Sequence, residues 1–407
     1  MLEQKHKRLL WLLAVACFSE GYDFALLTVA LPQVRSTFHL SHAHADLWIA
    51  LLYLGALPAL FWGRRADRHG RRDVLLWAIV GYTLASVVTA AAPVIEFYVA
   101  FQFIARCFIA TEVAIAWTMA AEDLPAQRRG LGFGALALAS ACGTGFCSIL
   151  QAVLLSPLNA SWRWLYVLAL PFLLVSQFLR RQLPESDRFL AVERRTTERT
   201  PATVLLRRPF IGPLLLVCVT VMLCNLTTEA TIFSIDFLET QRHLSTSEAN
   251  LLLVGAGALA LPVLTLSGRL SDRIGRRRVC VAGLLVMSGG LLVFFIVARG
   301  GLQLGLSLGL VYVGLFSAWT TGTAFAVEMF PTPLRGGASS AAAIAKLLGQ
   351  SASFALAAAL LTFTKRPEVT ISVLVIGPLA GAALIAFFFP ETSNRELEDA
   401  IPVTVGA

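Results

Sequence analysis

The sequence predicts an all-α membrane protein with 12 transmembrane helices, arranged as two pseudo-symmetric six-helix bundles. An apolar composition, twelve apolar runs and loop motifs that recur at a constant spacing support this prediction. Hydrophobic residues make up 57% of the 407 residues and charged residues 14%, whereas soluble proteins are closer to half apolar and a quarter charged. A spanning helix needs about 20 apolar residues. The composition therefore excludes an ordinary soluble enzyme, a disordered chain and a secreted disulfide-rich scaffold.

The apolar runs fall into two sets of six, separated by a polar segment of nearly thirty residues. The runs cover about 9–31, 46–63, 74–93, 96–120, 131–155, 164–179, 210–238, 250–267, 279–298, 302–327, 338–362 and 369–389. We number them as spans 1 to 12. The predicted domains are an amino-terminal bundle (1–180), a cytoplasmic linker (181–209) and a carboxy-terminal bundle with a short cytoplasmic tail (210–407).

The net charge of +8 is explained by the distribution of the basic residues. If the amino terminus is cytoplasmic, the cytoplasmic segments hold 25 of the 33 Lys and Arg residues and the outer loops hold six. This asymmetry satisfies the positive-inside rule. It predicts a multi-pass protein of the plasma or inner membrane, with both termini in the cytoplasm. The excess of basic residues then contacts anionic lipid head groups, and no nucleic-acid partner is expected.

Three loop landmarks recur in the two halves of the chain. The pattern G-x-x-x-D-R-x-G-R-R follows span 2 and, 205 residues later, span 8. Segments that begin at Glu122 and Glu328 follow spans 4 and 10, and P-E motifs follow spans 6 and 12, both at an offset of 206. Two halves of the same orientation place a solute site at mid-membrane between them.

These motifs, with P-E-S-D-R at 184–188 and P-E-T-S-N-R-E-L-E at 390–398, resemble those of the major facilitator superfamily. They are most similar to its sugar-porter and organic-acid:proton symporter branches, and E-G-Y-D-F at 20–24 resembles the E-W-Y-D-F of metabolite:proton symporters. The resemblance implies a secondary transporter rather than an enzyme, usually a monomer, in which spans 1, 4, 7 and 10 line a central cavity. Span 4 departs from the pattern, because Gln102 and Arg106 stand where such families often carry Arg and Gly.

The repeated loops predict a conformational latch on the cytoplasmic side. Glycines let a helix end approach its neighbour closely, and the aspartates can cap a following helix or pair with a basic residue. A solvated basic loop that only sets the topology is the alternative. The predicted latch residues are Gly63, Asp67, Arg68, Gly70, Arg71, Glu122, Arg129, Gly268, Asp272, Arg273, Gly275, Arg276, Glu328 and Arg335.

Charged residues in the interiors of the apolar runs occur only in spans 1, 4, 7 and 11. An ionisable group at the bilayer centre costs about 2.5–3.5 kcal/mol on insertion scales. Each charged residue within a span therefore needs a structural or functional explanation. Burial favours the neutral form of a carboxyl group, which suits reversible protonation during transport. Asp23 is the first candidate for the proton carrier, and Glu112, Glu20 and Glu229 are further candidates. A carboxylate that only hydrogen-bonds to Tyr22 or to a neighbouring helix is the alternative for Asp23.

The two intramembrane cations predict an anionic substrate. Arginine does not lose its proton, so Arg106 must meet a carboxylate or an anionic ligand, and Lys346 either binds an anionic group or neutralises a carboxylate. Asn225, Glu229 and Asp236 form a polar stripe on span 7, although Asp236 lies near the outer end, where water can hydrate it. The predicted substrate-binding residues are Arg106, Lys346, Gln350, Tyr22, Asn225, Gln151, Trp319 and Thr320.

The favoured function is proton-coupled symport of a small organic anion, such as a carboxylate or an aromatic acid, by alternating access. A proton-coupled sugar or polyol porter, a drug/proton antiporter, a non-transporting membrane receptor and a lipid-handling protein are the alternatives. The expected partners are a small-molecule substrate and membrane lipids. The seven cysteines have an odd count and spacings that fit no metal site, so no metal and no cofactor are expected besides the coupling proton.

Overall fold

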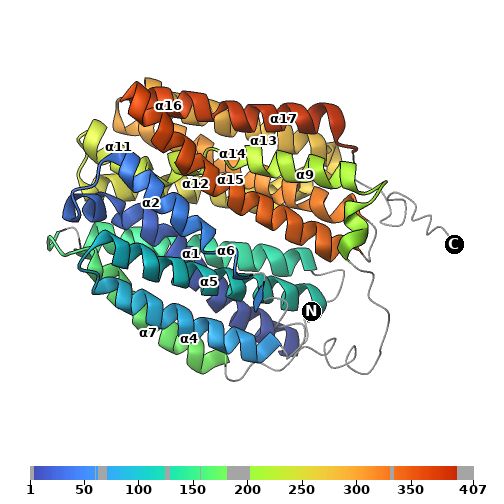
Figure 1. Cartoon of the computed structure of the whole chain (residues 1–407), viewed down its shortest axis with the longest axis horizontal. Coiled ribbons are helices and arrows are strands. Elements are labelled where there is room, and N and C mark those ends of the chain that lie inside the picture. Colours follow the sequence, from blue (N-terminus) through green and yellow to red (C-terminus); the bar gives the residue numbers. More distant parts are fainter. Residues whose placement is uncertain are drawn as a thin grey trace. The chain divides into compact units, whose positions relative to one another are not determined.

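The computed structural model describes residues 4–59, 61–62, 71–123, 129–155, 157–180, 202–330 and 334–391 (Figure 1). Helices lie in all twelve predicted spans, and the described residues contain no strand. Nine helical segments in this part of the chain are long and apolar enough to cross a membrane. The predicted all-α class is therefore confirmed.

The chain divides into two compact units, of which unit 1 comprises Met1–Thr197 and Thr231–Val254. Its helices are α1 (Gln4–Thr37), α2 (His42–Leu54), α4 (Arg71–Ala90), α5 (Ile95–Asp123), α6 (Arg129–Ile149), η2 (Leu150–Leu155), α7 (Arg163–Arg180) and α11 (Ser234–Gln241). Helix α12 (Thr246–Ile274) begins in unit 1 and continues into unit 2.

Unit 2 comprises Glu198–Ala230 and Gly255–Ala407. Its elements are η3 (Ala202–Leu206), α9 (Ile211–Cys224), α13 (Arg276–Leu292), η4 (Val293–Val297), α14 (Gly301–Glu328), α15 (Arg335–Thr364), α16 (Pro367–Leu374) and α17 (Ile376–Phe388). The short helix α10 (Thr228–Ile232) crosses the boundary between the units along the chain. The domain boundaries predicted at 180 and 210 stay a prediction.

Each unit pairs its helices in the same way. In unit 1, α1 packs against α6, and α4 packs against both α5 and α7. In unit 2, α9 packs against α15, and α13 packs against both α14 and α17. Because these pairs join corresponding spans of the two halves, the packing inside each unit repeats as the loop motifs do.

Glycines allow the closest of these helix contacts. A Cβ atom on Gly21 of α1 would lie 1.8 Å from the backbone oxygen of Ser140 on α6, and one on Gly143 would lie 2.0 Å from that of Phe18. In unit 2, a Cβ on Gly349 of α15 would lie 2.5 Å from the backbone oxygen of Met222 on α9. Small residues at such positions let membrane helices approach backbone to backbone.

We expect Gly21→Ala to destabilise the protein, because the added methyl group must push α1 away from α6. Overpacking of a tight interior contact typically costs about 1–3 kcal/mol. Gly145→Ala is the matched control, since a Cβ atom at Gly145 on α6 meets nothing within 4 Å. Thermal unfolding of the purified variants in detergent measures the difference. Equal melting temperatures for the two variants would contradict the close contact.

Candidate functional site

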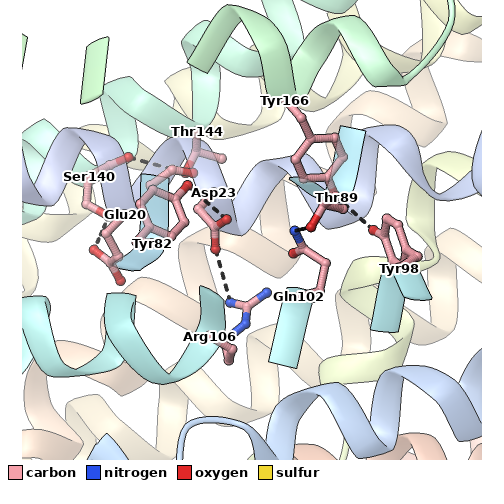
Figure 2. A network of polar contacts seen from close by, with 11 residues as sticks. Glu20, Asp23, Tyr82, Thr89, Tyr98, Gln102, Arg106, Ser140, Thr144 and Tyr166 are labelled. Atoms are coloured by element: carbon pink, nitrogen blue, oxygen red, sulfur yellow. Dashed lines mark hydrogen bonds and ion pairs between the residues drawn. The ribbon is translucent and has the colours of Figure 1, made fainter. Parts of the chain in front are cut away.

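A buried ion pair joins two of the sequence-predicted residues in unit 1. The carboxyl group of Asp23 on α1 is 3% exposed, and its Oδ2 lies 3.6 Å from Nη1 of Arg106 on α5. The hydroxyl group of Tyr82, on α4, donates a hydrogen bond of 3.0 Å to Oδ1 of Asp23. Figure 2 shows the three side chains converging from their three helices. Asp23 therefore has a fixed cation on one oxygen and a hydroxyl donor on the other.

The guanidinium group of Arg106 is held on a second side as well. Its Cζ lies 5.3 Å from the ring centroid of Tyr53 on α2, within the range in which a cation is attracted to an aromatic face. The side chain of Arg106 is 11% exposed. We call Asp23, Tyr53, Tyr82 and Arg106 the Asp23 cluster.

Two further polar contacts lie within unit 1 (Figure 2). The amide group of Gln102, one turn before Arg106, donates a hydrogen bond of 3.1 Å to the hydroxyl oxygen of Thr89. The hydroxyl groups of Tyr98 and Tyr166 share a hydrogen bond of 2.8 Å. These groups are buried, and in a bilayer buried polar groups must find partners within the protein.

The other predicted residues of unit 1 have different neighbours. Glu20 accepts a hydrogen bond of 3.0 Å from Ser140 on α6. The hydroxyl group of Tyr22 donates to the backbone oxygen of Leu165, at 2.8 Å, on α7. Glu112 and Gln151 are each 1% exposed. Asp23, one of the predicted proton-coupling residues, has an arginine partner.

Span 7 is broken where the sequence predicts a continuous helix. Helix α9 ends at Cys224, and the backbone N–H groups of Asn225, Leu226 and Thr228 bond to carbonyl groups three residues earlier. Asn and Thr side chains compete with helical hydrogen bonds. Here the Asn225 amide donates to the oxygen of Val221, and the Thr228 hydroxyl donates to the oxygen of Asn225, both at 2.8 Å.

A serine on α15 stabilises this break. The hydroxyl group of Ser353 accepts the backbone N–H of Glu229 at 3.0 Å and donates to the backbone oxygen of Leu226 at 2.7 Å. Ser353 is fully buried, and Glu229 is 4% exposed. The hydroxyl group thus satisfies a donor and an acceptor where the helix is interrupted, and it anchors Glu229 to α15.

Asp23 and Glu229 occupy equivalent positions in the two halves. They lie 206 residues apart, which is the offset of two of the three loop landmarks. Each is buried within its own unit. The repeat therefore supplies one buried carboxyl group to each half of the chain, in spans 1 and 7.

Lys346 is an exposed cation in the middle of a long apolar helix. It lies about 17 Å from the start of α15 at a rise of 1.5 Å per residue, and its Nζ lies 5.1 Å from the ring centroid of Trp319 on α14. The Trp319 side chain is 44% exposed. Because a lysine facing lipid at this depth is costly, we expect this face of α14 and α15 to border water.

Two more predicted substrate-binding residues of unit 2, Gln350 and Thr320, lie close in the sequence to Lys346 and Trp319. Gln350, one turn after Lys346 on α15, is 8% exposed. The hydroxyl groups of Thr320 and of Ser267, on α12, are 2.8 Å apart. Within the described residues, no group of three or more His, Cys, Asp or Glu side chains is arranged to hold a metal ion.

The predicted latch is described in part. Gly63, Asp67, Arg68 and Gly70 lie outside the described residues, as do the side chains of Arg71, Glu122, Arg129, Gly268, Asp272, Glu328 and Arg335. Arg273 is an exposed residue near the end of α12. Gly275 has φ +107, which favours glycine, and a Cβ there would lie 2.5 Å from Oε2 of Glu391. The Glu391 carboxylate accepts the backbone N–H of Arg276 at 2.8 Å, at the amino-terminal end of α13.

Three residues of these sites were missed in the sequence. Tyr53, Tyr82 and Ser353 look like ordinary members of apolar runs, and only their neighbours in space give them a role. The equivalence of Asp23 and Glu229, in contrast, can be read from the sequence, because the loop motifs already define the offset.

A family model described as Major Facilitator Superfamily matches residues 13–235 and 217–402. The chain is 25% identical, over 98% of its length and 95% of the relative's, to a Bacillus subtilis protein whose name assigns it to metabolite transport. It is 24% identical, over 78% of each chain, to the sialic acid transporter of Escherichia coli. The xylose transporter of E. coli in an inward-open conformation has a similar fold, with a TM-score of 0.76, 19% identity and coverage of 96% and 98%.

The family matches cover most of the chain, and the helical architecture agrees with them. The protein is therefore a multi-pass integral membrane protein and a transporter of small molecules rather than an enzyme. The chain belongs to the Major Facilitator Superfamily.

Proposed function

We propose that the protein is a secondary active transporter that couples proton entry to the uptake of a small organic anion, a carboxylate or an aromatic acid, by alternating access. The observation that carries the proposal is the buried pair of Asp23 and Arg106, with Tyr82 on the second carboxylate oxygen. A carboxyl group in this position can exchange its cation for a proton, so its charge can change during the transport cycle.

The exposed Lys346 supports an anionic substrate. Its ammonium group lies over the Trp319 ring, so a cation and an aromatic face stand together on the side of unit 2 that we expect to border water. Such a pair suits a carboxylate attached to an apolar or aromatic body. The name of one similar protein, the sialic acid transporter, refers to an acid, which agrees with this choice.

In the proposed cycle, Asp23 or Glu112 takes a proton from outside. A proton on Asp23 removes its negative charge and so weakens the ion pair between Asp23 and Arg106. The anion then binds at Arg106 and Lys346, with Glu20 and Glu229 as further carboxyl groups of the coupling system. The transporter opens to the cytoplasm and releases both proton and anion. Both termini are cytoplasmic in this arrangement, and the working unit is a monomer that needs no cofactor.

The test is transport by the purified protein in liposomes that contain a trapped pH dye. We expect the lumen to acidify when a carboxylate such as benzoate or a sugar acid is added outside, and to stay unchanged with neutral sugars or amines. Lys346→Gln should remove the response to carboxylates, and liposomes without protein measure passive entry of the acid. Acidification by a neutral sugar would replace the proposal with a sugar porter, and alkalinisation by an amine would replace it with an antiporter.

A further inference from the structure

The guanidinium group of Arg106 has a buried donor without a hydrogen-bond partner in the described part of the chain. This donor is Nε, whereas Asp23 approaches Nη1, as the dashed line in Figure 2 marks. In a guanidinium group, Nε–H and Nη2 lie along one edge, which does not include Nη1. Two parallel donors of this kind match the two oxygens of a carboxylate. We call this side of the group the Nε edge of Arg106.

The ion pair between Arg106 and Asp23 is looser than a second buried arginine–aspartate pair of unit 1. Its N···O distance of 3.6 Å exceeds the roughly 2.7–2.9 Å of a charge-assisted hydrogen bond. Arg35 of α1, in contrast, donates a hydrogen bond to Asp236 of α11, although Nε of Arg35 also has no hydrogen-bond partner within the described residues. Asp236 is 1% exposed, so the expectation from the sequence that water hydrates it is wrong. Attraction between the charges holds Arg106 near Asp23, but no hydrogen bond to this carboxylate fixes the direction of its donors.

Arg106 lies near the middle of its helix. It is about 17 Å from the start of α5 at a rise of 1.5 Å per residue, in a helix of 29 residues. A buried donor that makes no hydrogen bond costs free energy, and lipid chains offer it no acceptor. Because arginine keeps its charge, the acceptor that suits this donor is an anion. The Nε edge is therefore a place where a ligand with its own anionic oxygens gains binding energy.

Tyr53 of α2 contacts the guanidinium group in a way that needs no acceptor atom. The Cζ atom of Arg106 lies 5.3 Å from the centroid of the Tyr53 ring, and Tyr53 is 3% exposed. The face of an aromatic ring attracts a cation most strongly where water is excluded. This contact does not depend on the charge of Asp23. When Asp23 takes a proton in the proposed cycle, Arg106 loses its carboxylate partner but keeps the ring of Tyr53.

We propose that the Nε edge of Arg106 binds the carboxylate of the substrate, and that Tyr53 is the positioning residue of this site. Tyr53 holds the guanidinium group in place after Asp23 takes a proton, and the substrate then replaces Asp23 as the counter-ion. A carboxylate fills both donors of the edge and neutralises the cation, whereas a sugar hydroxyl group leaves the charge uncompensated. The inference rests on the proposed symport and adds to it the atoms that select the anion.

The test is a titration of para-fluorobenzoate, followed by fluorine nuclear magnetic resonance, with the full-length protein in lipid nanodiscs. The variants are made in Asp23→Asn protein, because asparagine cannot compete for Arg106, and we expect this background to bind the probe more tightly than the unsubstituted protein. Arg106→Lys keeps the positive charge but has no edge with two coplanar donors, so the Kd should rise about tenfold or more. Arg163→Lys is the matched control, since Arg163 also lies over an aromatic ring, that of Trp162 at 4.5 Å, and it should leave the Kd unchanged.

Tyr53 is tested by two substitutions in the same background. Tyr53→Phe keeps the face of the ring, so the Kd should stay as it is in Asp23→Asn protein. Tyr53→Leu removes this face, and the Kd should rise about tenfold, which is the size of effect that a buried cation–π contact supplies. With Asp23 intact, the aspartate also holds Arg106, so Tyr53→Leu should have a smaller effect there. A loss of packing alone would have the same effect in both backgrounds.

Three results would overturn the inference and leave the proposed symport in place, because the acid still binds. They are an unchanged Kd in Arg106→Lys, an equal effect of Tyr53→Phe and Tyr53→Leu, and weaker binding by Asp23→Asn protein than by the unsubstituted protein. If Arg106→Lys does not fold, Arg106→Gln in the Asp23→Asn background, which leaves no charge in the pair, takes its place. It should bind no para-fluorobenzoate, and binding would overturn the inference. If neither the unsubstituted nor the Asp23→Asn protein binds the probe, the anion site fails together with the proposed function.

Discussion

Asp23→Asn is expected to abolish proton-driven accumulation of the substrate while exchange of substrate across the membrane continues. Asparagine has nearly the shape of a protonated aspartic acid, so the variant resembles the protonated state at all times. It cannot release a proton, and it cannot form the ion pair with Arg106. The transporter would still carry the solute in both directions, but a proton gradient would no longer drive it.

Two assays on the same liposomes separate these effects. Uptake driven by a pH gradient measures accumulation, and counterflow of labelled against unlabelled substrate measures exchange. Glu96→Gln is the control, because Glu96 is an exposed carboxylate in the first turn of α5 and is not one of the predicted coupling residues, and we expect it to accumulate substrate. If Asp23→Asn accumulates substrate as the unsubstituted protein does, Asp23 has no part in coupling.

Arg106→Ala is expected to destabilise the protein strongly and to weaken the binding of anions. The substitution leaves the Asp23 carboxylate buried without its cation, and breaking a buried ion pair by removing one partner costs about 3–5 kcal/mol. It also removes the cation over the Tyr53 ring. The apparent melting temperature in detergent measures the loss of stability, and substrate binding is measured on the fraction that remains folded.

A double substitution shows where this loss originates. In Arg106→Gln combined with Asp23→Asn, no charge remains in the pair, so most of the stability should return although proton coupling should not. The coupling energy follows from this double variant and its two single variants, Arg106→Gln and Asp23→Asn. A double variant that is as unstable as Arg106→Ala would mean that the arginine stabilises the fold by contacts other than the ion pair. Equal weakening of anionic and neutral solutes by Arg106→Ala would point to the same conclusion.

The sequence by itself determined the class of fold, the twelve helical stretches and the repeat of the two halves. These features depend on local properties: an apolar run of sufficient length must become a helix in lipid, because its backbone groups have no other partners. The same reasoning identified Asp23, Arg106 and Lys346, since an ionisable residue within an apolar run is costly wherever it points. The equivalence of Asp23 and Glu229 follows from the repeat alone.

Only the tertiary structure determined which charged side chains form ion pairs with one another. Asp23 and Arg106 lie 83 residues apart, and helical periodicity gives the face of each residue on its own helix but not the neighbour that this face contacts. The polar stripe predicted on span 7 shows the limit most clearly. A helical wheel places Glu229 and Asp236 on one face, but the break at residues 225–227 and the irregular Phe233 intervene. Glu229 is bound to Ser353 of α15 through its backbone, and Asp236 is bound to Arg35 of α1, because packing against other helices outweighs the weak preference of a short polar segment for continuous helix.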